Sequence, residues 1–192
     1  MLILLFFLLL PTICYSASID RCVQYVHEVR VQHWKYFGLF FPYHYGVGQL
    51  RQESSCRADA VSFDGGKGLP QFMPATLKGV EQHLGSIDIF RPAEAIKAQA
   101  WYMATLHKGN FVAGSPLWIT YMCYNSGTGT VKKEYRRANS PSYNSMRVVC
   151  KRRVLQLKSG PLDLCDVGYD YPIQIYKYGK KYQLFPDGMR YW

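Results

Sequence analysis

Charged residues are absent from the first nineteen positions of the chain. An unbroken apolar run over residues 2–10 is followed there by proline and by small or polar residues up to Asp20. Crossing a hydrocarbon core takes about 20 apolar residues, so this run is too short for a comfortable membrane anchor. Its layout is typical of a secretory signal peptide, although no Lys or Arg precedes it. We therefore expect residues 1–18 to be a signal peptide, with cleavage after Ser16 or Ser18.

Acidic residues are scarce in the rest of the chain. There are 13 Asp and Glu against 23 Lys and Arg, and the formal net charge of +10 belongs to the mature protein. Such a charge favours an anionic polymer or surface as partner, whether peptidoglycan, nucleic acid or anionic lipid. The basic residues form short clusters at 132–137 and 151–153, for which a solvated helix face is an equally good explanation. Charge alone leaves the kind of partner open.

Metal-binding spacings are missing as well. No Cys-x-x-Cys pair and no His-x-x-x-His pair occurs, which argues against a zinc site or any other metal site. Of six cysteines, Cys14 leaves with the signal peptide, and the other five reach a compartment where disulfides form. Because five is an odd number, at least one cysteine stays outside any disulfide within the chain. We predict a disulfide between Cys150 and Cys165.

Other catalytic signatures are also lacking. The SGTGT segment at 126–130 has no lysine after its second glycine, which excludes a phosphate-binding loop. The five histidines have no matching serine or cysteine signature, so the sequence does not support a Ser-His or Cys-His hydrolase. There is no internal repeat and no low-complexity segment. The roughly 175 residues left after export suit one domain with a substantial core.

The pattern that is present is helical. Apolar residues recur at helical spacing after Asp20, and proline at the first position or glycine after the last one delimits several further segments. The glycine-rich segment 62–71 cannot be regular helix, so we expect a loop or a short irregular ribbon there. The predicted class is all-α. The expected helices span residues 20–35, 48–56, 74–84, 92–107, 116–124, 129–138, 146–158 and 172–180.

Two motifs within this pattern resemble those of a known family. The stretch ESSCRADAVSFDGGKGLPQFMPAT at 53–76 resembles the signature of the soluble lytic transglycosylases, in which Glu-Ser precedes Ala-x-Ser and Gly-x-x-Gly-Leu-x-Gln-x-Met-Pro-x-Thr. Further along, CYNSGTG at 123–129 is similar to the family's Ala-Tyr-Asn-x-Gly element. The matching residues are Glu53, Ser54, Ala60, Ser62, Gly65, Gly68, Leu69, Gln71, Met73, Pro74, Thr76, Tyr124, Asn125 and Gly127.

The resemblance covers approximately residues 40–138 and implies the family's lysozyme-like α-helical fold. We therefore expect a lysozyme-like transglycosylase domain at 19–138 and a C-terminal helical extension at 139–192 that packs on the same domain. The chain departs from the family's usual residues within the motifs and in the helix between them. The departures are Cys56 for an aromatic residue, Gly66 for alanine, Ala95 for asparagine, Gln99 for glycine and Cys123 for alanine.

The resemblance implies that Glu53 is the catalytic acid and base of a peptidoglycan lytic transglycosylase. Cleaving a glycosidic bond requires protonation of a poor leaving oxygen, so a carboxylic acid must stay protonated near neutral pH, and apolar burial achieves this. In this family the substrate's N-acetyl group assists and the 6-hydroxyl of the same sugar is the acceptor, which gives a 1,6-anhydro-muramic acid end. Tyr124 is expected to orient the acid. The implied substrate-binding residues are Ser62 for the acetamido group, Gln71 and Met73 for the sugar subsites, and Tyr124 and Asn125 facing the reacting ring.

Alternatives stay open beside this hypothesis. A goose-type lysozyme has the same fold and acid but uses water as the acceptor, and a wall-binding protein keeps the fold without catalysis. Among single residues, Ser62 also suits a cap of the glycine loop and Asn125 a helix C-terminal turn. Nucleic acid is not an expected partner, because no binding motif accompanies the basic charge.

The expected partner is the peptidoglycan glycan strand, and the expected form is a cofactor-free monomer in the periplasm or at the cell surface. Opening a path for a secretion or conjugation apparatus, wall remodelling, and phage lysis or entry all suit such an enzyme. The tail 175–192 mixes Tyr, Lys and Arg with a Pro-Asp-Gly turn. We favour a packed C-terminal cap over an exposed stacking surface for this tail, because so many aromatic residues would be costly to expose.

Overall fold

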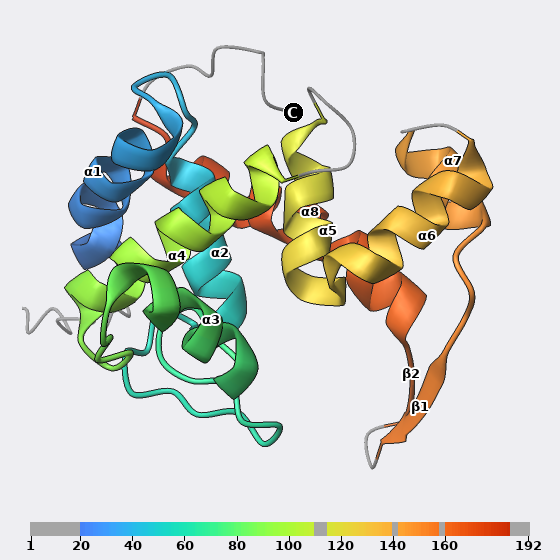
Figure 1. Cartoon of the computed structure of the whole chain (residues 1–192), viewed down its shortest axis with the longest axis horizontal. Coiled ribbons are helices and arrows are strands. Elements are labelled where there is room, and N and C mark those ends of the chain that lie inside the picture. Colours follow the sequence, from blue (N-terminus) through green and yellow to red (C-terminus); the bar gives the residue numbers. More distant parts are fainter. Residues whose placement is uncertain (1–19, 110–114, 140–141, 158–159, 185–192) are drawn as a thin grey trace, which may run out of the picture.

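The computed structural model describes residues 20–109, 115–139, 142–157 and 160–184 (Figure 1). The expected signal peptide and the last residues of the tail lie outside this part of the chain. Within it the chain is mostly helical, which confirms the predicted all-α class, and no helix there is long and apolar enough to span a bilayer. The elements are η1 (Val23–Tyr25), α1 (Val26–Phe37), α2 (His44–Ser54), α3 (Pro74–Leu84), α4 (Pro92–Lys108), α5 (Leu117–Ser126), α6 (Thr128–Ala138), α7 (Tyr143–Val148), β1 (Val154–Leu157), β2 (Gly160–Asp163), α8 (Leu164–Gly179) and η2 (Lys180–Tyr182).

Helix α2 is buried over most of its length, from His44 to Leu50. It packs against α1 and, more extensively, against α8. Gly48 permits this close approach, because a Cβ at this position would lie only 2.4 Å from the Ile175 carbonyl oxygen of α8. The C-terminal helix α8 therefore packs directly on the helix that carries Glu53.

The remaining elements surround this pair. Buried apolar clusters lie around α1 to α4, between α2, α5 and α8, and among α5 to α8. The β1–β2 hairpin, α6 and α7 lie on the other side of α5 from α1 and α3 (Figure 1). The two strands pair antiparallel, with Val154 opposite Asp163 and Leu157 opposite Gly160. In the described part of the tail Tyr182 is buried and Leu184 is exposed, and the packed cap stays a prediction.

Two of the predicted helices are wrong. The helix expected at 146–158 ends at Val148, and the segment beyond it continues into β1. Leu155 and Leu157, two residues apart as in a strand, are exposed on the hairpin. The helix expected at 172–180 begins earlier, at Leu164, because Asp163 caps it: its Oδ1 accepts a hydrogen bond from the Cys165 amide at 2.9 Å.

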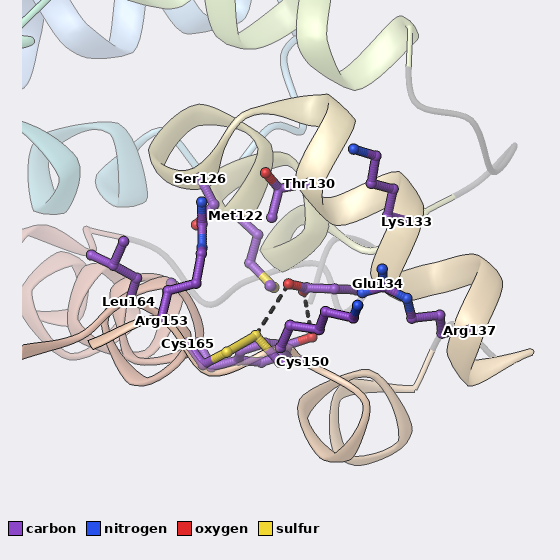
Figure 2. Close-up of a pocket in the computed structure, with 13 residues that line it drawn as sticks. Met122, Ser126, Thr130, Lys133, Glu134, Arg137, Cys150, Arg153, Leu164 and Cys165 are labelled. Atoms are coloured by element: carbon purple, nitrogen blue, oxygen red, sulfur yellow. Dashed lines mark hydrogen bonds between the residues drawn. A yellow bond between two sulfur atoms is a disulfide. The ribbon is translucent and has the colours of Figure 1, made fainter. Parts of the chain in front are cut away.

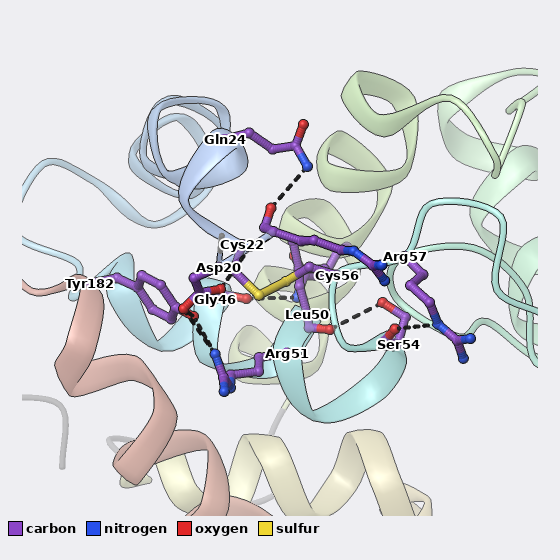
Figure 3. Close-up of a disulfide and its surroundings, with 12 residues drawn as sticks. Asp20, Cys22, Gln24, Gly46, Leu50, Arg51, Ser54, Cys56, Arg57 and Tyr182 are labelled. Atoms are coloured by element: carbon purple, nitrogen blue, oxygen red, sulfur yellow. Dashed lines mark hydrogen bonds and ion pairs between the residues drawn. A yellow bond between two sulfur atoms is a disulfide. The ribbon is translucent and has the colours of Figure 1, made fainter. Parts of the chain in front are cut away.

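Two disulfides tie these elements together. The predicted bond between Cys150 and Cys165 is confirmed. A second bond, not predicted, joins Cys22 before η1 to Cys56 just after α2 (Figure 3). Cys123 belongs to neither disulfide and is buried in α5.

Polar side chains reinforce the second disulfide on one side (Figure 3). Arg51 of α2 donates to an Asp20 carboxylate oxygen at 2.9 Å and to the Tyr182 hydroxyl at 3.1 Å. The Tyr182 hydroxyl in turn donates to Asp20 at 2.7 Å. These contacts thus join Asp20 and η2 to α2, the helix that carries Glu53.

Candidate active site

Glu53 lies in the last turn of α2 and is partly buried. The pKa of Glu53 is raised from 4.5 to about 7, chiefly because burial desolvates the carboxylate; a hydrogen bond from Tyr171 opposes this rise, and the nearby negative charge of Asp64 adds to it. A carboxyl group with a pKa near 7 can both donate and accept a proton at neutral pH. This is the property that a single acid and base needs.

Tyr171 of α8 is the residue that contacts this carboxyl group. Its side chain is buried, and its hydroxyl donates to Glu53 Oε1. The sequence assigned this orienting role to Tyr124, whose hydroxyl donates instead to the Pro70 carbonyl oxygen at 2.6 Å. The Tyr124 ring lies parallel to that of Tyr171, with 6.5 Å between the ring centroids. Tyr124 thus connects the glycine-rich segment to Tyr171 and not to the acid directly.

A buried amide pair continues from Tyr171 into the core. Gln49 Nε2 donates to the Tyr171 hydroxyl at 3.2 Å, and Gln49 Oε1 accepts from Gln99 Nε2 at 2.8 Å. Gln99 Nε2 also donates to the Gly46 carbonyl oxygen at 3.3 Å. Both glutamines are fully buried, and buried polar groups rigidify a core when they are hydrogen-bonded to one another. Gln99, which stands where the family usually has glycine, therefore supports the position of Tyr171 from α4.

The glycine-rich segment forms the short irregular ribbon that the sequence predicts as one of two options. Isolated bridges join Val61 to Lys67 and Lys67 to Phe72. Gly68 has a φ of +69°, and a Cβ there would lie 2.2 Å from the Ile89 carbonyl oxygen, so only glycine fits. The close contact between the backbones at Gly68 and Ile89 holds the ribbon beside the segment that precedes α4.

Ser62 and Gln71 use their polar groups within this ribbon. Ser62 Oγ accepts from the Gly66 amide at 2.7 Å and donates to Asp64 Oδ1. Gln71 Nε2 donates to the carbonyl oxygens of Gly68 at 2.8 Å and of Ala60 at 3.2 Å. The loop-capping alternative for Ser62 thus describes its contacts here, and the substrate roles of both residues stay predictions.

A groove opens in front of Glu53. It has a volume of about 480 Å3, and Glu53, Asn125 and Tyr171 line it together. Its other wall comes from the C-terminal segment, with Pro161, Leu162, Asp163, Asp166, Val167, Asp170 and Gln174. Of the predicted site residues, this groove brings together Glu53 and Asn125, whereas Ser62, Gln71, Met73 and Tyr124 are not on its lining.

No motif predicted Tyr171 or the groove wall formed by β2 and α8. Both lie beyond residue 138, where the resemblance ends. The one usable signal was the predicted Cys150–Cys165 disulfide, which fixes the first turn of α8. In the described part of the chain, no three His, Cys, Asp or Glu side chains are grouped so that they could hold a metal ion.

Comparison with known proteins gives one family. The model of the transglycosylase SLT domain matches residues 48–146, slightly more than half of the chain. No match is found among curated proteins. The matched range contains Glu53 and the Tyr124–Asn125 pair, and it stops before Tyr171.

Two solved structures are similar over most of this chain. An inactive mutant of the lytic transglycosylase Slt from Pseudomonas aeruginosa has a TM-score of 0.60 and 21% identity, over 81% of this chain and 23% of its own. The 70 kDa soluble lytic transglycosylase SLT70 from Escherichia coli has a TM-score of 0.60 and 18% identity, over 79% of this chain and 23% of its own. The chain thus spans about a quarter of the length of each. At this identity the likeness shows the fold, and it confirms the predicted lysozyme-like class.

Proposed function

The chain belongs to the transglycosylase SLT domain family, and from this membership we propose that it is an exported lytic transglycosylase that cleaves the bond between N-acetylmuramic acid and N-acetylglucosamine in peptidoglycan. The observation that carries the proposal is Glu53, a partly buried acid with a pKa of about 7 at the edge of a groove. A basic protein suits this anionic wall polymer. The two disulfides suit an extracytoplasmic location, in the periplasm or at the cell surface.

The reaction needs one acid that acts twice. Protonated Glu53 gives its proton to the glycosidic oxygen as the bond to C1 of the muramic acid breaks, and the substrate's own acetamido oxygen stabilises C1. The Glu53 carboxylate then takes the proton of the 6-hydroxyl of the same sugar, whose oxygen attacks C1. The product is a 1,6-anhydro end, Glu53 is protonated again, and no water is consumed.

The rival reaction is hydrolysis, as in a goose-type lysozyme, with water in place of the 6-hydroxyl. Asp64, whose carboxylate raises the pKa of Glu53, is one acid that could activate water. Its carboxylate oxygen, however, accepts a hydrogen bond from Ser62. A third candidate is a wall-binding protein without catalysis, against which the raised pKa of Glu53 argues.

Digestion of purified murein by the mature protein tests the proposal. Mass spectrometry of the soluble products is expected to find muropeptides that lack one water relative to reducing ends and that resist borohydride reduction. Reducing ends in proportion to cleavage would favour the lysozyme, and binding without soluble products would favour the wall-binding protein.

Tyr171→Phe is expected to change the pH profile of the enzyme. The Tyr171 hydroxyl lowers the pKa of Glu53, so its removal raises that pKa above about 7. Glu53 must be protonated to act as the acid, and the alkaline limb of kcat/KM therefore moves to higher pH. Loss of the orienting hydrogen bond also lowers kcat by roughly tenfold.

The matched control is Tyr178→Phe, on the same helix, whose ring lies 5.1 Å from the Arg51 guanidinium. Rates measured across pH are expected to be the same for this control and the wild type. If the alkaline limb of Tyr171→Phe stays where it is in the wild type, Tyr171 does not lower the pKa of Glu53.

A further inference from the structure

A second cavity shares no lining residue with the catalytic groove (Figure 2). It lies among α5, α6, α8 and the segment between α7 and β1, and its volume is about 170 Å3. Pockets that enclose a whole small molecule span about 300–1,000 Å3. The cavity, called the basic pocket below, therefore has room for one small group only. Its charged lining residues are Lys133, Glu134, Arg137, Lys151 and Arg153.

The four cationic side chains of the basic pocket are not neutralised by ion pairs. Within the described part of the chain, none of them forms an ion pair with a carboxylate. Arginines close by in sequence behave differently. Arg147 lies 3.1 Å from Asp166, and Arg152 lies 2.7 Å from Asp163. The positive charge at this concave surface is thus not balanced by ion pairs, unlike that of Arg147 and Arg152.

Glu134, the one acid on this lining, does not balance the four cations. Its side chain is buried, and its Oε2 accepts from the Tyr169 hydroxyl at 2.9 Å. Burial raises the pKa of Glu134. Its Oε1 lies 3.1 Å from Cys150 Sγ, and because a disulfide sulfur has no proton to donate, this contact favours the protonated carboxyl group. Even an ionised Glu134 would leave the pocket with an excess of positive charge.

The cations flank this buried carboxyl group. Figure 2 shows Arg153 on one side of Glu134 and Lys133 and Arg137 on the other. Guanidinium groups bind planar oxyanions such as carboxylates through paired hydrogen bonds. The arrangement therefore suits a small oxyanion that enters from solvent between the two sides.

The basic pocket adjoins the catalytic groove through shared elements. At the end of α5, Asn125 lines the groove and the next residue, Ser126, lines the pocket. On α8, Asp166 faces the groove, while Cys165 and Gly168 face the pocket. A polymer held in the groove thus passes beside the helices that also form the pocket.

We propose that the basic pocket binds a carboxylate of a stem peptide carried by the glycan strand that occupies the groove. The inference rests on the proposed function, because that function places a peptide-bearing strand beside α8. Each stem peptide ends in a carboxylate, and its attachment to muramic acid leaves it free to extend away from the sugar chain. The pocket would thus direct the enzyme to peptide-bearing strands in preference to denuded ones.

Binding by a protein that cannot cut the strand tests this assignment. The Glu53→Gln variant is titrated with soluble glycan fragments that bear stem peptides, and with the same fragments after an amidase has removed the peptides. In this background, Arg137→Gln with Arg153→Gln is expected to lower the ratio of the two affinities roughly tenfold, because charge-assisted hydrogen bonds to the carboxylate are lost. Melting temperatures confirm that the variants are folded.

The matched control is Lys132→Gln with Arg136→Gln, which removes two exposed charges from the same helix without touching the pocket. An equal fall of the affinity ratio in this control would show general attraction and overturn the inference, as would an unchanged ratio in the pocket variant. The same variants are also tested for binding to phosphatidylglycerol vesicles. If the pocket variant loses binding only to these vesicles, the pocket is reassigned to lipid headgroups. Failure of the Glu53→Gln protein to bind either fragment would overturn the proposed function itself.

Discussion

Glu53→Gln is expected to lower murein cleavage by roughly 10³–10⁴-fold, because general acid and base catalysis each contribute on this scale and one residue supplies both. Glutamine keeps the size of the side chain and an oxygen that accepts from Tyr171, but it has no proton to give. Release of soluble fragments from labelled murein measures the loss. The control is Glu28→Gln, which is expected to keep full activity. Glu28 is an acid of α1 whose carboxylate accepts a hydrogen bond from Gln32.

The same substitution is expected to stabilise the protein at high pH. The pKa of Glu53 is 4.5 in the unfolded chain and about 7 in the folded one, so the folded state binds the proton more tightly. Stability contributed by this proton is complete below pH 4.5 and is lost as pH rises through 7, by at most about 3 kcal/mol. Glutamine does not titrate. Urea unfolding at about pH 4 and about pH 8 is therefore expected to show a difference between variant and wild type only at the higher pH.

A variant with equal activity would remove Glu53 from the reaction, whatever its stability. Equal stability of the two proteins at both pH values would show instead that the Glu53 carboxyl group is not desolvated in the folded state.

Removal of the disulfide between Cys22 and Cys56 is expected to cause the largest loss of stability. The bond spans 34 residues, and closing a loop of this length restricts the unfolded chain by about 4 kcal/mol in the chain-entropy model. It also holds the end of α2, where Ser55 and Cys56 both have positive φ angles of 52° and 58°. Cys22→Ala with Cys56→Ala is thus expected to lower the free energy of unfolding and, since Glu53 lies in the same turn, the activity as well.

The comparison is the variant Cys150→Ala with Cys165→Ala. Its bond spans 15 residues, so the chain-entropy model gives a smaller loss, about 3 kcal/mol. Urea unfolding under non-reducing conditions measures both variants. A Cys22–Cys56 variant with the stability of the wild type would show that the polar contacts of Asp20, Arg51 and Tyr182 suffice at this end of α2.

Helices with strong local signals could be predicted from sequence. Proline at the first position and glycine after the last one delimit α3, whose bounds agree with the prediction of Pro74–Leu84. Pro92 likewise begins α4. Here the backbone preference of individual residues and the tertiary structure agree, so a short stretch of sequence contains the necessary information.

The C-terminal segment was predicted less well. Leu155 and Leu157 are two residues apart, which is the spacing of a strand, and residues 154–157 pair with residues 160–163 in a hairpin where a helix was expected. Pro172 resembles a helix start, yet it lies inside α8, which Asp163 caps, which begins at Leu164 and which packs on α2. At Pro172 the tertiary contacts of α8 override the local signal.

The candidate site divides in the same way. The motifs place Glu53, Asn125 and the glycine-rich ribbon, whose geometry local residues determine. Tyr171 and Gln99 are brought to this region by the packing of α8 and α4, whereas Gln49 lies one turn before Glu53 on the same helix. Tyr171 donates the hydrogen bond to Glu53, and the orienting role of Tyr124, whose ring lies parallel to that of Tyr171, stays a prediction.

In the proposed reaction Glu53 directs the sugar's own 6-hydroxyl, and not water, to the anomeric carbon. Digestion of murein by the wild-type protein in ¹⁸O-labelled water tests it most directly, with mass spectrometry of every new glycan end. Anhydro ends without the label are expected. New ends that carry ¹⁸O in proportion to the bonds cleaved would contradict it and would make the protein a hydrolase.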